Sequence, residues 1–165
     1  MPEDIQPIVD SDDNIIGYKP RSLVGIDDIY RVATLWIRDR NGRFLLSQRS
    51  LSKERHPGYW GPAVTGTVEK GETYQENSIR EAEEELGIKG LLFKEGPKIF
   101  RDRDWRFFCQ YFILVLDWPE DRFRIQKSEV ERVKWFTREE IESELVSGRE
   151  KFLTASVRTM LDYFD

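Results

Sequence analysis

Three glutamates with helical spacing could bind a metal ion. Glu81, Glu84 and Glu85 occupy positions i, i+3 and i+4 within the stretch GTVEKGETYQENSIREAEEELGI, so in a helix their carboxylates share one face. Like charges on adjacent turns repel and raise one another's pKa. A hard divalent cation, which prefers oxygen ligands, turns that repulsion into binding. The spacing therefore indicates a divalent-metal site.

The flanking residues predict both ends of the helix that carries these glutamates. Thr73 and Glu76 fit a capping box, and Gly87 supplies a C-terminal stop. At roughly 100° per residue, three apolar residues gather nearly opposite the glutamates: Ile79, Ala82 and Leu86. One face is expected to pack and the other to bind metal. From charge alone, an ordinary solvated helix face is the alternative.

A cluster of cations precedes the glutamate helix. Arg49, Lys53 and Arg55 lie at the entrance of the polar loop LSKERHPGYW. They either keep a surface loop soluble or form a clamp for the anionic part of a phosphorylated substrate. Aromatic residues around the glutamate stretch also have two interpretations, stacking on a base or filling the core: Trp60, Trp105 and Tyr111.

The composition predicts one globular domain spanning residues 1–165. The chain has 39% apolar residues and a net charge of −5, which argues against partners such as nucleic acid polymers or anionic membranes. Cys109 is the only cysteine, so no intrachain disulfide can form and a cytoplasmic location is expected. Neither a signal peptide nor an apolar run of membrane-spanning length is recognisable.

The order of predicted elements indicates an α/β or α+β fold in which helices cover a mixed sheet. An N-terminal hairpin is expected from two short strand patterns around the turn DSDDN, which we interpret as a solvated turn. We assign residues 1–28 to this extension and 29–165 to the core. Further strands surround the central helix, and two more helices follow, one of them with a capping box at Thr137 and Glu140.

The glutamate stretch resembles the Nudix box, G-x5-E-x7-R-E-U-x-E-E-x-G-U, in which U is aliphatic. Every defined position is met, by Gly66, Glu72, Arg80, Glu81, Ala82, Glu84, Glu85, Gly87 and Ile88. The resemblance implies a Nudix α/β/α sandwich. It also implies hydrolysis of a nucleoside diphosphate linked to another moiety, with Mg2+ or Mn2+ as the cofactor.

Outside the box, the chain is similar to the isopentenyl-diphosphate isomerase-like branch of the family. The similar segments are LSKERHPGYW and the N-terminal IVDSDDNIIG. The isomerases of that branch use a cysteine and a metal-binding histidine in a CGH triplet, which here reads Thr65-Gly66-Thr67. Tyr30 stands where another metal histidine would fall, and Phe107 where a catalytic glutamate would fall. The acid and the base that isomerisation requires are therefore missing.

The resemblance assigns roles to individual residues. The metal ligands are expected to be the carboxylates of Glu81, Glu84 and Glu85 together with the backbone carbonyl of Thr65. Either Glu84 or Glu129 accepts the proton of the attacking water, and Arg80 pairs with Glu72 as a scaffold.

The expected partner is a small-molecule diphosphate. Arg49 and Lys53 match isomerase residues that contact the diphosphate, so they are expected to bind substrate. The first alternative is a noncatalytic diphosphate-binding module, and the second is an isomerase. A homodimer through the N-terminal hairpin or a sheet edge is compatible with the sequence, which contains nothing that decides it.

Overall fold

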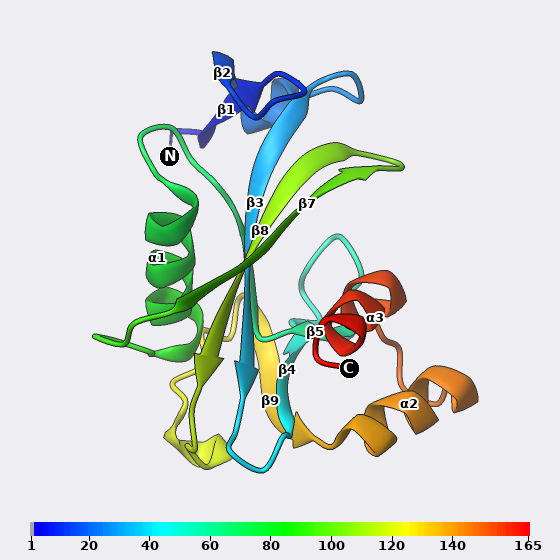
Figure 1. Cartoon of the computed structure of the whole chain (residues 1–165). Coiled ribbons are helices and arrows are strands. Elements are labelled where there is room, and N and C mark those ends of the chain that lie inside the picture. The colour runs from blue at the N-terminus through cyan, green and yellow to red at the C-terminus, as the bar shows by residue number, and fades with distance from the viewer. Residues whose placement is uncertain (1) are drawn as a thin grey trace.

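The computed structural model describes residues 2–165 as a mixed β-sheet with helices on both sides (Figure 1). The helix α1 lies on one side of the strands, and α2 and α3 lie on the other. The strands are β1 Ile5–Val9, β2 Ile15–Pro20, β3 Ile29–Arg38, β4 Phe44–Arg49, β5 Trp60–Pro62, β6 Val64–Thr67, β7 Lys94–Asp102, β8 Arg106–Val115 and β9 Val130–Phe136. The helices are α1 Tyr74–Leu86, α2 Arg138–Ser147 and α3 Thr154–Tyr163, with short 3-10 turns at Arg21–Leu23 and Glu120–Arg122. This arrangement confirms the predicted class.

The long strand β3 organises the sheet. It pairs antiparallel with β1, β4 and β6, and parallel with β8 along its whole length. Both β3 and β8 are predominantly apolar and largely buried, as expected for strands covered on two faces. The strand β9 extends the sheet beyond β4, and β7 extends it beyond β8. The N-terminal hairpin of β1 and β2 joins the sheet at Val9, which is opposite Ile29 of β3.

The predicted ends of α1 are confirmed, but its packing face is rotated from the predicted one. The Thr73 hydroxyl accepts a hydrogen bond from the Glu76 backbone amide, and the Glu76 carboxylate accepts one from the Thr73 backbone amide. At the other end of α1, Gly87 adopts a left-handed backbone conformation with φ 71°. Ala82 and Leu86 are fully buried, whereas Ile79 is 40% exposed, so its predicted place in the packing face is wrong. The small residue Ser78 is buried in its place, because the helix lies close to the sheet at this turn.

The other side of the sheet is closed by the C-terminal helices. The capping box of Thr137 and Glu140 begins α2, as predicted, and the buried residues Val157 and Met160 of α3 pack in a core cluster that includes Trp36. Two hydrophobic clusters therefore lie on the two faces of the sheet, one of them containing α1 residues. Within residues 2–165, no helix is both long and apolar enough to cross a membrane.

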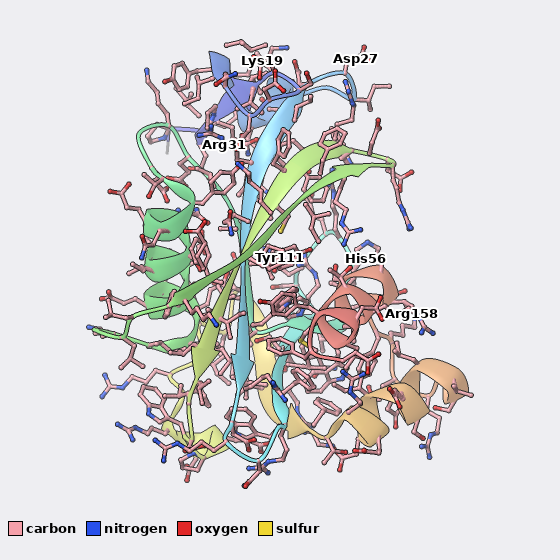
Figure 2. The ribbon with its side chains drawn as sticks, viewed as in Figure 1. Lys19, Asp27, Arg31, His56, Tyr111 and Arg158 are labelled. Atoms are coloured by element: carbon pink, nitrogen blue, oxygen red, sulfur yellow. The ribbon has the colours of Figure 1, made fainter. Side chains whose placement is uncertain are left out.

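The turn of the N-terminal hairpin is tied to the core by a carboxylate. Asp13, in a left-handed conformation at φ 64°, accepts hydrogen bonds from Arg31 Nε and Lys98 Nζ at 2.8 Å and from the Tyr74 hydroxyl at 2.9 Å. Arg31 lies below the hairpin in Figure 2. The Asp13 side chain is only 7% exposed, so the prediction of a solvated turn is wrong for this residue. Its contacts join the hairpin to β3, α1 and β7.

We expect Asp13→Asn to destabilise the fold. Burial alone raises the pKa of Asp13, but the hydrogen bonds from Lys98, Arg31 and Tyr74 outweigh it and lower the pKa. Asparagine tolerates the left-handed backbone but removes the charge, which should cost about 3 kcal/mol of unfolding free energy. The measurement is urea unfolding of both proteins, with the exposed neighbour substitution Asp12→Asn as control.

The same substitution has a pH signature with a defined sign. A carboxyl group with a lowered folded-state pKa stabilises the protein above its ordinary value of 3.8, and that contribution is lost as the pH falls below it. The stability difference between wild type and Asp13→Asn should therefore be full near neutral pH and shrink in acid. A difference that is constant with pH would contradict the assignment to the Asp13 charge.

Candidate metal and diphosphate site

Two of the three expected metal ligands lie together between α1 and the sheet. Glu85 is 9% exposed, and Glu81 lies one turn before it. Burial first, and then the neighbouring Glu81 charge, raises the pKa of Glu85 to about 9. Protonated Glu85 donates a hydrogen bond to Glu81, whose own pKa is raised, chiefly by burial. Without a cation, this pair therefore holds a proton that an exposed carboxyl group would release.

Gly66 makes room for this pair. A side-chain Cβ at Gly66 would lie 2.6 Å from Glu81 Cγ and 2.8 Å from Asn77 Oδ1, so only glycine fits between β6 and α1 here. Asn77 is fully buried and donates from its amide to the Thr67 carbonyl at 3.0 Å. The first glycine of the box thus brings the β6 backbone, including Thr65, against the glutamate face of the helix.

The third expected ligand points elsewhere. Glu84 is half exposed and pairs with Arg80 at 3.2 Å, while the same guanidinium contacts Glu72 at 2.8 Å and Glu81 at 3.2 Å. The predicted Arg80–Glu72 pair is confirmed, and it ties the loop before α1 to the helix. Within residues 2–165, no three His, Cys, Asp or Glu side chains are arranged to hold a metal ion.

The donor set nevertheless suits a hard divalent cation. Glu81 and Glu85 lie close together, with a proton held on the buried Glu85, and Mg2+ or Mn2+ would relieve the repulsion between their charged forms. Glu84 can add a third carboxylate if its exposed side chain leaves Arg80.

The expected substrate cations and the second candidate base form one cluster beside the carboxylate pair. Lys53 Nζ contacts the Glu129 carboxylate at 2.5 Å, and the Glu129 carbonyl accepts the Ser50 amide at 3.0 Å. Burial lowers the pKa of Arg49, and the charges of Glu129 and Glu85 oppose this, which places its guanidinium in their field. Arg49 and Lys53 are close in sequence, and Glu129, the residue before β9, joins them.

A cavity of about 450 Å3 opens at this cluster. Arg49, Lys53 and Thr67 line it, so one wall is continuous with the β6 segment that faces Glu81. Its size is in the range of about 300–1,000 Å3 typical of small-molecule sites. The N-terminal hairpin contributes Gln6 to the lining, a residue that the sequence does not single out.

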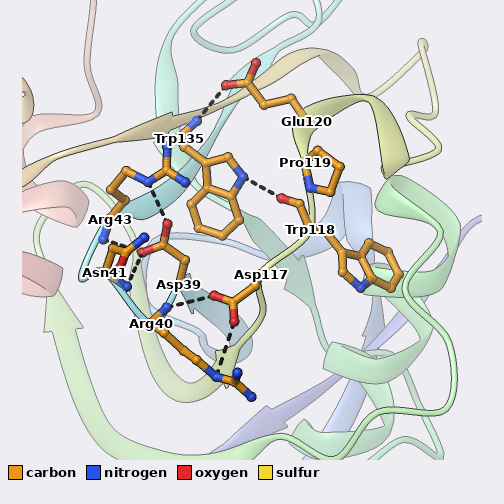
Figure 3. Close-up of a pocket in the computed structure, with 9 residues that line it drawn as sticks. All are labelled: Asp39, Arg40, Asn41, Arg43, Asp117, Trp118, Pro119, Glu120 and Trp135. Carbon is orange, nitrogen blue, oxygen red and sulfur yellow. Dashed lines mark hydrogen bonds and ion pairs between the residues drawn. The ribbon is translucent and has the colours of Figure 1, made fainter.

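A larger concavity of about 780 Å3 lies at the opposite end of the sheet, around the β3–β4 turn (Figure 3). Its polar groups satisfy one another: Arg43 Nε donates to Asp39 at 2.6 Å, and the Trp135 indole donates to the Trp118 carbonyl at 2.8 Å. It contains no residue of the glutamate stretch, so we do not assign the chemistry to it.

The remaining sequence candidates divide between core and surface. Trp60 and Tyr111 are buried in the core, and of the three aromatic candidates only Trp105 lines the 450 Å3 cavity. Cys109 is a buried thiol whose pKa is raised by burial, which agrees with a structural role. His56 is exposed on its loop, on the side of the strands away from α1 in Figure 2.

Comparison with known proteins identifies the class of this fold and site. A family model described as the NUDIX domain matches residues 29–155. An uncharacterised Nudix hydrolase of Yersinia pestis is 35% identical over 136 residues, covering 81% of this chain and 73% of that protein. The uncharacterised Nudix hydrolase YfcD of Escherichia coli K12 is 33% identical over 136 residues, covering 81% and 74%. The chain therefore belongs to the Nudix family.

Solved structures share the fold. The DR0079 protein of Deinococcus radiodurans superposes with a TM-score of 0.74 at 23% identity, covering 89% of this chain and 91% of that one. The NUDIX domain of Shewanella oneidensis NrtR, crystallised with ADP ribose, has a TM-score of 0.58 at 16% identity, covering 77% and 82%. At these identities the likeness establishes architecture alone.

The raised pKa of Glu85 predicts that metal binding releases a proton. Near pH 7 the metal-free protein keeps this carboxyl protonated, so Mn2+ binding should release about one proton, and the release should decline as the pH rises through about 9. Calorimetric titration with Mn2+ in two buffers of different ionisation enthalpy measures this number. Glu85→Gln should release none, whereas Glu83→Gln, a change at an exposed position of the same helix, should behave as wild type.

The raised pKa of Glu85 also makes the metal-free protein less stable as the pH rises. From the ordinary value of 4.5 up to about 9, the folded state keeps a proton that the unfolded chain has lost, so rising pH destabilises it. Glu85→Gln should therefore gain melting temperature relative to wild type across this window, at roughly 2–4 °C per kcal/mol. A melting-temperature difference independent of pH would contradict the protonated pair.

Proposed function

We propose that this Nudix protein uses Mg2+ or Mn2+ to hydrolyse a phosphoanhydride bond of a small diphosphate compound, such as a nucleoside diphosphate joined to another group. The observation that carries the proposal is the buried Glu81–Glu85 pair next to the cavity bearing Arg49 and Lys53. Membership of the family supports hydrolysis of a pyrophosphate-containing substrate.

Separate residues of the chain bind the metal and the substrate. Glu81 and Glu85 would hold the metal, and Glu84 and the Thr65 carbonyl would complete the ligand set. A bound divalent ion neutralises charge on the diphosphate and lowers the pKa of the attacking water. Arg49 and Lys53 bind the diphosphate oxygens. Water adds to one phosphorus as the bridging P–O bond breaks, leaving a phosphate group on each product.

The Lys53–Glu129 pair links substrate binding to the proton acceptor. In the free protein Glu129 is neutralised by Lys53 at 2.5 Å. A diphosphate that draws the Lys53 ammonium toward its own oxygens leaves Glu129 unpaired and able to accept a proton. Glu84 is the alternative acceptor, and it is equally restrained by a cation, Arg80, in the free protein.

Hydrolysis is preferred to isomerisation because the residues at the isomerase positions are chemically unsuited to it. Tyr30 and Phe107 stand opposite each other in the β3–β8 register, with ring centroids 5.4 Å apart. Burial raises the pKa of the Tyr30 hydroxyl, so it does not act as a base near neutral pH. The likeness of LSKERHPGYW to the isomerase branch is then a likeness in diphosphate binding, and we propose that it extends no further.

A screen with product identification tests the proposal. Nucleoside diphosphates, nucleotide sugars, dinucleotides, ADP ribose and isoprenoid diphosphates are incubated with the protein and Mg2+, and products are identified by mass spectrometry. ADP ribose is included because it is bound in the NrtR structure. Monophosphate products are expected. Binding without cleavage of any compound would favour a noncatalytic module, and a dimethylallyl product from isopentenyl diphosphate would favour an isomerase.

We expect Glu84→Gln to lower Mg2+-dependent turnover by at least about 10²-fold while the fold stays intact, because either a metal ligand or the base is lost. The matched control is Glu83→Gln, the adjacent exposed position, which should retain wild-type turnover. Full activity in Glu84→Gln would contradict the role of this residue.

The Mg2+ dependence distinguishes the two candidate bases. If Glu129 is the acceptor, Glu129→Gln should lose roughly 10²–10⁴-fold in turnover at every Mg2+ concentration, since the metal ligands are untouched. Glu131→Gln, two residues along β9, serves as the control. Near-normal turnover in Glu129→Gln would leave Glu84 as the proton acceptor.

A further inference from the structure

Two cations besides Arg49 and Lys53 line the 450 Å3 cavity. Arg21 comes from the turn after the N-terminal hairpin, and Arg55 comes from the β4–β5 loop. Together with Arg49 and Lys53 they give the cavity wall four cationic side chains against one carboxylate, that of Glu54. Segments far apart in the chain thus gather positive charge around one small space.

Arg21 and Arg55 are available to a ligand. Within residues 2–165 neither side chain forms an ion pair, whereas Lys53 is already engaged with Glu129. The Arg55 guanidinium lies over the Trp105 ring at 5.1 Å, which orients it without neutralising it. The charges of Arg55 and Arg21 also oppose the burial that raises the pKa of Tyr30, so both lie near its hydroxyl.

Two further polar side chains of interest line the same cavity. The Tyr30 hydroxyl is one, and the side-chain amide of Gln6 is the other. Gln6 is only 4% exposed, lines the cavity, and makes no side-chain hydrogen bond to another residue in the described range 2–165. The Gln6 amide therefore keeps its hydrogen-bonding capacity free, and a ligand in the cavity that accepts from it gains a hydrogen bond.

We propose that Arg21, Arg55, Tyr30 and Gln6 form a second phosphoryl subsite, for a phosphate monoester carried by the group attached to the scissile diphosphate. Two guanidinium forks, a hydroxyl and an amide offer the donors that a phosphoryl group accepts. This rests on the proposed function and narrows it: the substrate class is a diphosphate compound bearing an additional phosphate.

The N-terminal hairpin acquires a role through this subsite. Gln6 lies on β1, and Arg21 follows β2, so both depend on the position of the hairpin relative to β3. Asp13 fixes that position through Arg31 of β3. The extension therefore supplies specificity for the distal part of the substrate, while the Nudix box supplies the metal ligands.

Binding of ligand pairs that differ by one phosphate tests the subsite. Calorimetry without metal compares NADP+ with NAD+, and coenzyme A with dephospho-coenzyme A. We expect the phosphorylated member of at least one pair to bind about tenfold or more tightly. The double variant Arg21→Gln/Arg55→Gln should bring that ratio toward one. Lys53→Gln should weaken both members and keep the ratio.

Arg103→Gln, at an exposed position two residues before Trp105, is the matched control and should keep the wild-type ratio. The subsite is overturned if neither pair shows a preference, whether or not the ligands bind, or if the preference survives in the double variant. Because binding is measured without metal, a failure of the subsite can be distinguished from a failure of the proposed hydrolysis. A preference for the phosphorylated ligand with no Mg2+-dependent cleavage would retain the subsite and reject the hydrolase.

Discussion

The site depends on packing two carboxylates of one helix against a strand backbone. Glu81 and Glu85 lie where α1 meets β6, and the absence of a side chain at Gly66 permits the approach. Burying two like charges is unfavourable, and the protein without metal meets that cost by keeping a proton on Glu85. A cation in the same place would replace the proton. The stability of the metal-free protein and its expected metal binding therefore depend on the same two carboxyl groups, Glu81 and Glu85.

Two groups of cations surround this carboxyl pair: Arg80 in one, and Arg49 and Lys53 in the other. Arg80 pairs with Glu72, Glu81 and Glu84, which ties the loop before α1 to the helix. Arg49 and Lys53 lie near Glu85 and Glu129, where a diphosphate can replace carboxylates as their partner. Each of the two candidate bases, Glu84 and Glu129, is therefore paired with a cation in the free protein.

Local features of the fold could be predicted from the sequence, and long-range ones could not. The capping residues Thr73 and Glu76 and the left-handed Gly87 act within one turn of chain, so their spacing specifies the ends of α1. The sequence pattern places the packing face one position away from its observed place, because Ile79 and Ser78 differ by only about 100° and the close approach of β6 favours the smaller residue. Asp13 was misjudged because its partners are 18 to 85 residues away.

The candidate site shows the same division. The box motif selects Glu81 and Glu85, but the burial that raises their pKa comes from a sheet that the motif does not describe. Gln6 and Arg21 reach the cavity through the hairpin, and no local pattern distinguishes them from ordinary surface residues. Sequence thus predicts which carboxylates share a helix better than it predicts which residues line the neighbouring cavity.

A crystal structure with Mn2+, using its anomalous scattering, tests whether Glu81 and Glu85 form a metal site. We expect an anomalous peak coordinated by Glu81 and Glu85, with the Thr65 carbonyl beside it and the hydrogen bond between the two carboxyl groups broken. A peak bound elsewhere, or Glu81 and Glu85 still bonded to each other at saturating Mn2+, would contradict it.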